Sequence, residues 1–566
     1  MQELTKAQQG RIAIRAFKTI ANGLALRGFY RPNGQSGKTL ERALCMLSPE
    51  IYGSMNDLRR IELEGLEYVL DRLPRGIESC NRIVLTAQEE FEDTPFEPIQ
   101  PLKRRRLSYQ VSDREICFVI TRGLSEIYDI LTHITFLNIE AKKIYGQMTD
   151  DRGQTTAEWQ SMAAYLQNGD DPSEGQLDKA LWDLSILLGR TYQETRKTFH
   201  SLETSRLEAN SNNGLFRIIY DLGKRVEAEN ADPDHALRIY FTPALQELIG
   251  HHKYGESWAR HISDTLRELD VPDRPLHIVC ANMHSVVNTL YAYAALQDSP
   301  PEADQLDLYE FFGEVRDRSE DVREFALNHG LIELPDISGA QIDCQIIDPL
   351  HLAAIPLHPG VHINPMAIEA RQPLILVMDY AFGTQAFEVM DELLDVLCAG
   401  EDNRSMGVDS ISIMGKAGIL PGQKGDIMLA TAHVLEGSTD NYIVDNDLSP
   451  TDFDCPETIY VGPMVTVLGT SLQNRDVLER FQTTTWQAVG LEMEGGHYQR
   501  AISAAVIRGH IPSDVKLRYA YYASDNPLVS GQTLASGGMG DEGILPTYMI
   551  TKVILEKILN GSGASQ

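Results

Sequence analysis

The stretch "QPLILVMDYAFG", residues 372–383, decides the fold class of this sequence. Five apolar residues, Leu374 to Met378, follow Pro373 without a polar interruption, which predicts a strand buried on both faces. The next residues, "TQAFEVMDELLDVLCAG", carry apolar side chains at helical spacing. A buried strand that leads directly into a helix indicates an α/β sheet with helices on both faces.

The same alternation continues on both sides of this stretch. A short apolar run at 276–280 predicts a first strand, and an acidic stretch at 298–330 predicts a helical insertion. Together these elements predict an α/β domain over residues 272–561. The further strands are expected in "AQIDCQIID" (340–348), "AAIPLHP" (353–359), "DSISIMGKAGIL" (409–420), "GDIMLATAHVL" (425–435), "PMVTVLGTS" (463–471), the start of 486–509, and "VKLRYAYYASD" (515–525).

Residues 1–270 have a different pattern. Segments such as "RIAIRAFKTIANGLALRGF" and "DLRRIELEGLEYVLDRL" place apolar residues at helical spacing, and polar breaks separate them. We therefore expect an all-helical N-terminal region. It contains no obvious chemical constellation, and packing, oligomer contacts or a lid are all compatible with it.

The charge of the chain excludes several partners. Its formal net charge of −31 repels phosphate backbones and anionic lipid, so we expect neither nucleic-acid polymer binding nor membrane binding. The one basic run, "KRRR" from Lys103 to Arg106, is expected to be a solvated loop. Seven scattered cysteines without a CxxC pair, and no apolar signal segment, favour a cytoplasmic protein without a metal site or cofactor.

Small and polar residues gather at the predicted strand ends, where ligands bind in open α/β sheets. Glu492 and Glu494 in "LEMEGG" are carboxylates in an apolar context, and such groups are costly to bury unless they are paired or used. Asp525 in "YASDNP" closes a strand. Gly415 and Gly418 in "MGKAG" allow close approach of a ligand. Each pattern alone also fits a strand edge, a capping Asp or a tight turn.

In this order the stretches "SISIMGKAGILPGQKGDIMLATAHV", "VTVLGTSLQNRD", "AVGLEMEGGHYQ" and "YYASDNPL" resemble the nucleoside phosphorylase/nucleosidase superfamily. Within it the sequence is most similar to the catalytic domain of the AMP nucleosidases. The resemblance covers residues 370–530 well and 272–370 loosely. It implies a three-layer α/β/α domain, a homo-oligomer, and cleavage of the N-glycosidic bond of a purine nucleotide or nucleoside.

The resemblance also implies roles for single residues. Asp525, paired with Ser524, would protonate or hydrogen-bond the departing base, and Glu494 would anchor the ribose hydroxyls. Met493 would pack under the ribose, and Glu492 would assist. One of two aromatic residues would stack on the base. These two are Phe481 and Trp486.

The nucleophile stays open at this stage. A 5′-phosphate site would draw on Thr470, Ser471, Arg475 and Lys416, and an attacking phosphate would meet only Gly383 and Thr384. The stretch "ANMHSVV" lacks the glutamate with which related nucleosidases activate water, and its His284 is either a base or a turn residue. Hydrolysis is preferred over phosphorolysis because the Arg and Ser with which phosphorylases usually hold the attacking phosphate are missing, and phosphate is the alternative co-substrate. The alternative function is a catalytically weak nucleotide sensor that uses the same pocket.

Overall fold

The computed structural model describes residues 4–87, 91, 94–104, 106–150, 152–167, 174–271, 274–296, 306–398, 406–455, 458–529 and 539–561. The chain divides into two compact units: unit 1 comprises residues 1–251 and 469–477, and unit 2 comprises residues 252–468 and 478–566. The border lies before α10 (Lys253–Glu268), not near residue 270. Helix α10 belongs to unit 2 because its apolar face is buried there, and Trp258 donates to the Ile342 carbonyl at 2.9 Å.

Unit 1 contains a six-stranded sheet, which corrects the expectation of an all-helical region. Its strand order is β1-β6-β2-β5-β4-β3, with β2 parallel to β5 and β6 and the other pairs antiparallel. The strands are β1 (Phe29–Tyr30), β2 (Arg82–Thr86), β3 (Glu97–Pro98), β4 (Leu107–Ser112), β5 (Glu115–Val119) and β6 (Arg238–Phe241). Each of these strands has at most six residues, too few to be distinguished from the helical segments by the apolar pattern alone.

Helices α1, α2, α3, α6 and α8 pack against α4, most of whose residues are buried. Buried charged residues along α4 pair within the unit: Asp129 accepts from Arg106 at 2.7 Å, and Glu140 lies 2.9 Å from Lys143. Arg106 is therefore a buried ion-pair partner and not part of a solvated loop. The helices of the unit are α1 (Lys6–Arg27), α2 (Gln35–Leu47), α3 (Leu63–Leu70), α4 (Gly123–Met148), α5 (Ala157–Gln167), α6 (Glu174–Leu188), α7 (Tyr192–Ala209), α8 (Leu215–Ala231) and α9 (Pro243–Leu248).

Unit 2 is built on a ten-stranded sheet with the order β13-β12-β14-β15-β11-β7-β10-β9-β8, and β16 pairs with β11 and β12. The central strands β10, β7, β11 and β16 run parallel. The strands are β7 (Leu276–Cys280), β8 (Leu331–Leu334), β9 (Cys344–Ile347), β10 (Leu374–Met378), β11 (Val408–Ile419), β12 (Ile427–Leu435), β13 (Asn441–Ile443), β14 (Ile459–Thr466), β15 (Gly490–Glu492) and β16 (Lys516–Asp525). The strand expected at 353–359 is wrong: a 3-10 helix (Pro349–Ala354) includes its first two residues, and residues 355–359 form no strand.

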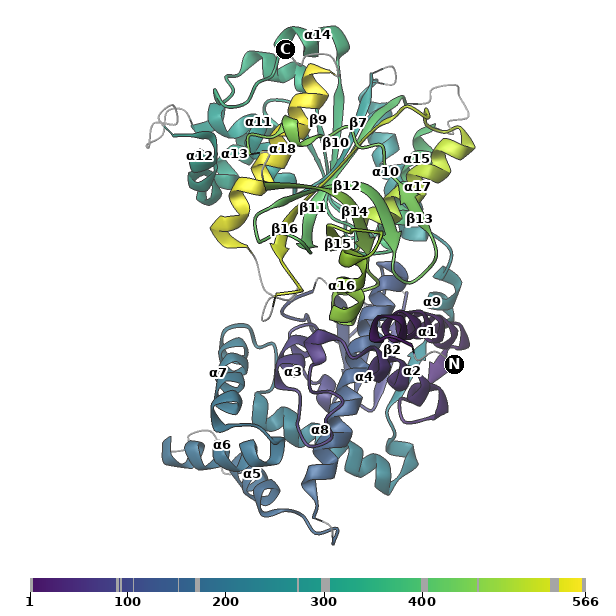
Figure 1. Ribbon diagram of the computed structural model, residues 1–566, viewed down its shortest axis with the longest axis vertical. Coiled ribbons are helices and arrows are strands. Elements are labelled where there is room, and N and C mark those ends of the chain that lie inside the picture. Colours follow the sequence, from purple (N-terminus) through teal and green to yellow (C-terminus); the bar gives the residue numbers. More distant parts are fainter. Residues whose placement is uncertain are drawn as a thin grey trace. The chain divides into compact units, whose positions relative to one another are not determined.

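Helices flank this sheet on two sides (Figure 1). One group comprises α11 (Met283–Leu296), α12 (Leu308–Val315), α13 (Ser319–Leu327) and α18 (Ile544–Asn560), and the other comprises α10, α15 (Gln385–Cys398) and α17 (Gly495–Arg508). Helix α14 (Pro365–Arg371) is a short helix of unit 2. Helix α16 (Arg475–Thr483) begins in the segment 469–477, which belongs to unit 1, and continues into unit 2.

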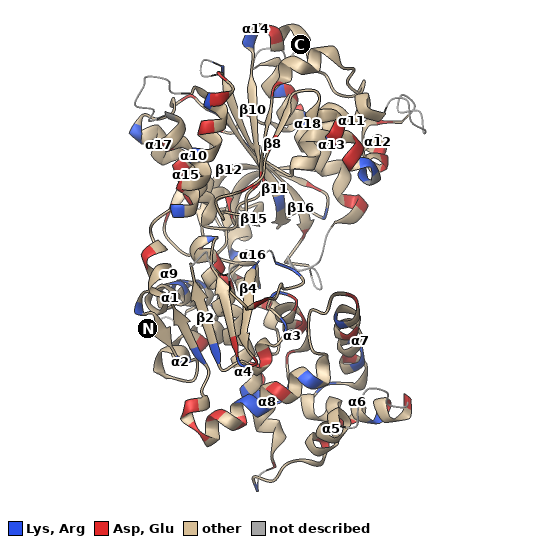
Figure 2. Ribbon diagram, turned by 180° about the vertical axis from the view of Figure 1, so that it is seen from behind, with Lys and Arg blue, Asp and Glu red and all other residues tan. Residues whose placement is uncertain are grey.

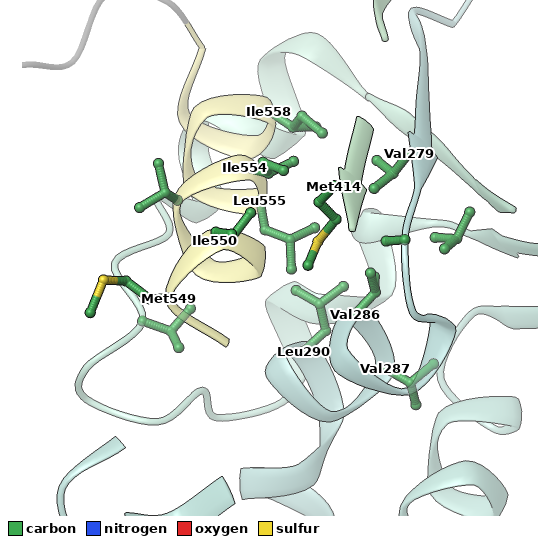
Figure 3. Packing of buried hydrophobic residues seen from close by; sticks show 14 of the residues in the cluster. Val279, Val286, Val287, Leu290, Met414, Met549, Ile550, Ile554, Leu555 and Ile558 are labelled. Atoms are coloured by element: carbon green, nitrogen blue, oxygen red, sulfur yellow. The ribbon is translucent and has the colours of Figure 1, made fainter. Parts of the chain in front are cut away.

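The core on the α11 and α18 side is apolar and continuous. Val279 of β7 and Met414 of β11 face Ile550 and Ile554 of α18 and Leu290 of α11 (Figure 3). All of these side chains are at most 1% exposed, and burial of such groups is the main stabilising contribution to a fold. Acidic residues gather on the outer helices of this side, on α12 and α13 (Figure 2). The predicted acidic insertion is thus helical where the structure describes it.

Candidate active site

Unit 2 contains a cavity of about 650 Å³ at the carboxyl ends of its parallel strands. Strand β7 ends at Cys280, which pairs with Ile413, whereas β11 continues to Ile419. The cavity lies where β11 extends beyond the end of β7, and Cys280, the Met414–Lys416 segment and Tyr521 line it. Parallel α/β sheets place ligands in such a position, because the loops that follow the strands can diverge there.

Glu494 lines this cavity just before α17 begins. Its Oε1 accepts a hydrogen bond from the backbone N–H of Gly383 at 2.9 Å. This bond connects the "AFGTQ" and "LEMEGG" stretches, which lie far apart in the sequence. Gly383 has φ +56°, in the region that favours glycine, so this donor is held by a turn that other residues adopt with strain.

Glu492 also lines the cavity, but its carboxylate is engaged by the protein. It accepts from the backbone N–H groups of Glu494 (2.5 Å) and Gly495 and from the Thr466 hydroxyl (2.5 Å), and its Oε1 lies 3.3 Å from His433 Nδ1. Burial raises the pKa of Glu492, but His433, Thr466 and the Gly495 amide outweigh burial and hold it below its usual range. Glu492 therefore acts as an ionised cap for the first turn of α17.

Asp525 ends β16 opposite Gly418 of β11. It is 2% exposed, and its Oδ1 accepts a hydrogen bond from the Ser524 hydroxyl at 2.5 Å. Its Oδ2 is buried and has no hydrogen-bond partner among the described residues. Burial raises the pKa of Asp525 to about 6, against the smaller effects of the Ser524 hydrogen bond and of Lys416, which lower it. The carboxyl can thus hold or release a proton near neutral pH.

Lys416 and Gly415 line the cavity from β11. The Lys416 ammonium is the charge from this strand that lowers the pKa of Asp525, but Asp525 itself does not line the cavity. Gly418, Ser524, Met493, Gly383 and Thr384 are likewise near the strand ends without lining the cavity.

The two aromatic candidates for base stacking do not line the cavity. Phe481 is 2% exposed in the core of unit 2, and Trp486 is 36% exposed. Three of the four residues predicted to hold a 5′-phosphate, Thr470, Ser471 and Arg475, belong to unit 1. There the Thr470 hydroxyl forms a 2.9 Å hydrogen bond with the Tyr68 hydroxyl. Lys416 is the one candidate of this group in the cavity.

Sequence reasoning missed the aromatic lining of the cavity. Phe312 and Tyr548 stack on each other with centroids 3.9 Å apart, and Tyr380, Tyr498 and Tyr521 contribute further rings. In "RYAYYASD" the tyrosines looked like ordinary strand core. His284 and Arg316 also line the cavity. Arg316 comes from the acidic insertion and pairs with Asp541 at 2.9 Å.

Among the residues that the structure describes, no group of three or more His, Cys, Asp or Glu side chains is arranged to hold a metal ion. None of their helices combines the length and the apolar composition that a membrane crossing requires.

Fold and site define an α/β protein with an aromatic cavity at the carboxyl ends of its parallel strands and a buried acid at the end of one of these strands. The chain belongs to a family of unknown function, DUF6909, whose model matches residues 38–300 and 308–560. No curated protein matches the chain.

Several solved structures of nucleosidases and phosphorylases are similar to part of this chain at low identity. The Campylobacter jejuni 5′-methylthioadenosine/S-adenosyl homocysteine nucleosidase is 11% identical over 51% of this chain and 99% of its own, with a TM-score of 0.30. The native futalosine hydrolase of Helicobacter pylori is 12% identical over 50% and 99%, with a TM-score of 0.28. Uridine phosphorylase from Schistosoma mansoni is 12% identical over 56% and 92%, with a TM-score of 0.30.

Proposed function

We propose that this protein cleaves the N-glycosidic bond of a purine nucleotide or nucleoside, and that hydrolysis is preferred over phosphorolysis. One observation carries the proposal: Asp525 is a buried carboxyl with a pKa of about 6, one unpartnered oxygen, and a position at the end of a central strand. A departing base gathers negative charge as the bond to the sugar breaks. A carboxyl whose pKa is raised toward neutral pH can donate a proton and so neutralise this charge.

The proposed reaction follows from this placement. The bond between the base nitrogen and C1′ breaks, and its electron pair stays with the base, which takes the proton of Asp525. The sugar becomes cationic at C1′, as in other glycosidic cleavages. Water adds to C1′ and loses a proton, and Asp525 regains a proton from solvent. His284 lines the cavity and is a candidate to accept the proton of the water.

Glu494 supports the cationic sugar in this proposal. Its carboxylate lines the cavity, and the Gly383 amide fixes one of its oxygens. A carboxylate can accept hydrogen bonds from sugar hydroxyls and stabilise positive charge nearby. Met493 is proposed to pack under the ribose, and Lys416 to contact a phosphate group of a nucleotide. The aromatic pair Phe312 and Tyr548 offers an apolar wall to the base.

The proposal also covers the architecture of unit 2, the compartment and the oligomeric state of the protein. We propose that unit 2 is a three-layer domain of the nucleoside phosphorylase kind, which the helices on two sides of its sheet support. The protein is proposed to act in the cytoplasm as a homo-oligomer, without a cofactor. Size-exclusion chromatography with light scattering tests the oligomer.

The decisive experiment is chromatography for released base. The purified chain is incubated with AMP, adenosine, inosine, guanosine, uridine and methylthioadenosine, each with and without phosphate. Base release from a purine substrate without phosphate is the expected result. Asp525→Asn should lower the rate roughly 100- to 10,000-fold. Asp264→Asn is the matched control, because the side chain of Asp264 is 68% exposed on α10.

The other outcomes separate the alternatives. Release that requires phosphate would make the protein a phosphorylase. Binding without release from any substrate would support a nucleotide sensor and contradict the enzymatic proposal. An unchanged rate in folded Asp525→Asn would remove Asp525 from the mechanism.

A further inference from the structure

Tyr380 presents an accessible aromatic ring to the cavity. The residue follows β10, is 41% exposed, and is one of the residues that line the cavity. The other described aromatic residues of the lining are less accessible, since Tyr548 is partly buried and the rest are at most 9% exposed: Phe312, Tyr498, Tyr521 and Tyr522. Single exposed aromatic residues are common on outer surfaces, but an accessible ring at the wall of a cavity is a contact surface for a ligand.

The accessible surface of Tyr380 faces the cavity and not open solvent. Burial is the largest of the effects that raise the pKa of its hydroxyl well above the usual value, so protein surrounds the residue on most sides. A side chain that is both accessible and surrounded by protein borders a concave space. Hydrogen bonding to the Tyr522 hydroxyl and to the Asn282 backbone also affects this pKa, so the protein holds the hydroxyl end and leaves the ring to a ligand.

The ring of Tyr380 reaches across the end of β7. This strand lies between β10 and β11 in the sheet and ends at Cys280. The Tyr380 side chain starts beyond the end of β10 and nevertheless lies next to β11, since a Cβ at position 415 would be 3.6 Å from its Cε1. Because Gly415 has no side chain, this edge of the ring stays uncovered, and Gly415 lines the same cavity.

The loop that carries Tyr380 also fixes Glu494, the proposed contact of the sugar. The Gly383 amide donates to Glu494 Oε1 at 2.9 Å. Gly383 follows Tyr380 by three residues, so the Cα atoms of these two residues are at most about 11 Å apart. A nucleoside bound with its sugar at Glu494 can therefore place its base on the Tyr380 ring.

We propose that the ring of Tyr380 stacks on the base of a ligand whose sugar Glu494 holds, so that the cavity selects ligands with a planar aromatic ring. Stacking on an aromatic side chain suits any planar base and needs no base-specific hydrogen bond. The inference rests on the proposed function for the identity of the ring, a purine. It makes Tyr380 a determinant of specificity in place of Phe481 and Trp486, which do not line the cavity.

Four variants separate stacking from other effects. Tyr380→Leu and Tyr380→Gln remove the ring and replace it with an apolar and a polar side chain, whereas Tyr380→Phe keeps the ring and removes only the hydroxyl. Trp486→Leu is the matched control, because Trp486 is also an exposed aromatic residue of unit 2 but does not line the cavity. Circular dichroism and thermal unfolding verify that each variant is folded before its affinity is measured.

The test measures affinity by calorimetry with a C-nucleotide analogue of AMP, whose carbon–carbon bond is not cleaved. Tyr380→Leu and Tyr380→Gln should each weaken binding roughly tenfold, because the stacking contact is lost. Tyr380→Phe and Trp486→Leu should change the affinity by less than about twofold. Unchanged affinity in the two variants without the ring, or a loss in Tyr380→Phe as large as theirs, would overturn the inference while leaving the proposed function intact.

A second ligand separates this inference from the proposed function. Free adenine carries the planar ring without a sugar, and its binding is followed by saturation-transfer NMR. If no nucleotide or nucleoside binds the wild type, the proposed function is wrong. In that case an adenine signal that is reduced in Tyr380→Leu but not in Tyr380→Phe would still support the stacking site. An equal signal in all three proteins, or none in the wild type, would overturn it.

Discussion

Two buried carboxyls in unit 2 have pKa values shifted in opposite directions, and their partners explain the difference. Glu492 has backbone amides, a hydroxyl and an imidazole around it, so its pKa lies below the usual range despite burial. Asp525 has one hydroxyl and the more distant Lys416, so burial dominates and its pKa is about 6. A pair of acids whose environments separate their pKa values is a common arrangement in active sites. The first carboxylate holds backbone in place, and the second is available for proton transfer.

Asp525→Asn should change the pH dependence of stability in a defined direction. The pKa of Asp525 is about 6 in the folded state and 3.8 in the reference state, so its ionisation opposes folding. In the wild type this loss is absent below pH 3.8, grows as pH rises and is complete above about pH 6. It amounts to at most about 3 kcal/mol of unfolding free energy.

The difference in unfolding free energy between Asp525→Asn and the wild type should therefore shift in favour of the variant between pH 4.5 and pH 8. Urea unfolding at both pH values measures it, with Asp264→Asn as the control that shows no shift. A difference that is the same at both pH values would contradict a raised pKa at Asp525.

Part of the site could be predicted from residue types and strand ends. Gly415, Lys416 and Glu494 follow from the rule that ligands bind at the carboxyl ends of strands, and they line one cavity. Tyr521 could not be identified in this way, because an apolar strand with tyrosines is also typical of a core. Whether a buried hydroxyl has a partner depends on atoms from β12, β15 and α17, which local sequence does not specify.

At the scale of single elements, the start of α17 depends on Glu492. The first turn of a helix has backbone N–H groups without partners in the helix, and here one carboxylate accepts from Glu494, Gly495 and, at 3.4 Å, Gly496. Gly496 is itself restricted, because a Cβ would lie 2.3 Å from Thr466 Oγ1. Strand end, cap and helix therefore form one rigid corner that positions Glu494.

Glu492→Gln should destabilise this corner. The amide of glutamine places a donor against backbone donors, and the neutral side chain loses the favourable interaction with the helix N-terminus. We expect a loss of about 2–3 kcal/mol in unfolding free energy, measured by urea denaturation. Glu542→Gln is the control, because Glu542 is 69% exposed and its surface ion pair with Lys424 contributes little. Equal stability of both variants would show that the cap is dispensable.

Gly495→Ala tests the close packing around the Tyr521 hydroxyl. The added methyl group meets the Tyr521 hydroxyl oxygen and the His433 ring, so the variant should lose about 1–3 kcal/mol of unfolding free energy. Tyr521→Phe removes the oxygen and should restore part of that loss in the double variant. Purely additive losses in the double-mutant cycle would argue against this contact.

The secondary structure of unit 1 shows which elements the spacing of apolar residues can predict and which it cannot. The long helices were predicted correctly, since α1 and α3 lie in segments with apolar residues at helical spacing. The six strands were not, because segments such as "RIVLT" and "RIYF" are too short to distinguish from helix ends. β4 and β5 pair locally, but the complete sheet also needs pairing between residues 29–30, 82–86 and 238–241, a separation that no local window covers.

At the scale of the whole molecule, each unit contains a buried histidine that must be neutral. His133 of α4 is fully buried, with its Nδ1 3.3 Å from the Tyr52 hydroxyl, and His277 of β7 lies 2.7 Å from the Ser410 hydroxyl. Burial, together with nearby arginines, lowers the pKa of each to about 3, although Asp129 raises that of His133. Both units should therefore be acid-sensitive for the same physical reason.

The sign of this effect follows from linkage. Because the folded pKa values lie below the ordinary value of 6.5, the unfolded chain binds protons more readily, and stability is lost as pH falls below 6.5. At pH 5 each histidine should lower the unfolding free energy of its unit by about 2 kcal/mol relative to pH 7. A single melting temperature does not separate the units, since chains with more than one domain need not unfold in one step.

Hydrogen exchange followed by mass spectrometry separates them, because peptides from α4 and from β7 report on different units. His277→Asn should reduce the loss of protection between pH 7 and pH 5 in peptides of β7, after correction for the intrinsic exchange rate, and leave that of α4 unchanged. His133→Asn should do the reverse. If either variant altered the pH dependence of both units equally, the two units would unfold as one cooperative structure, and the division into two compact units would not describe their stability.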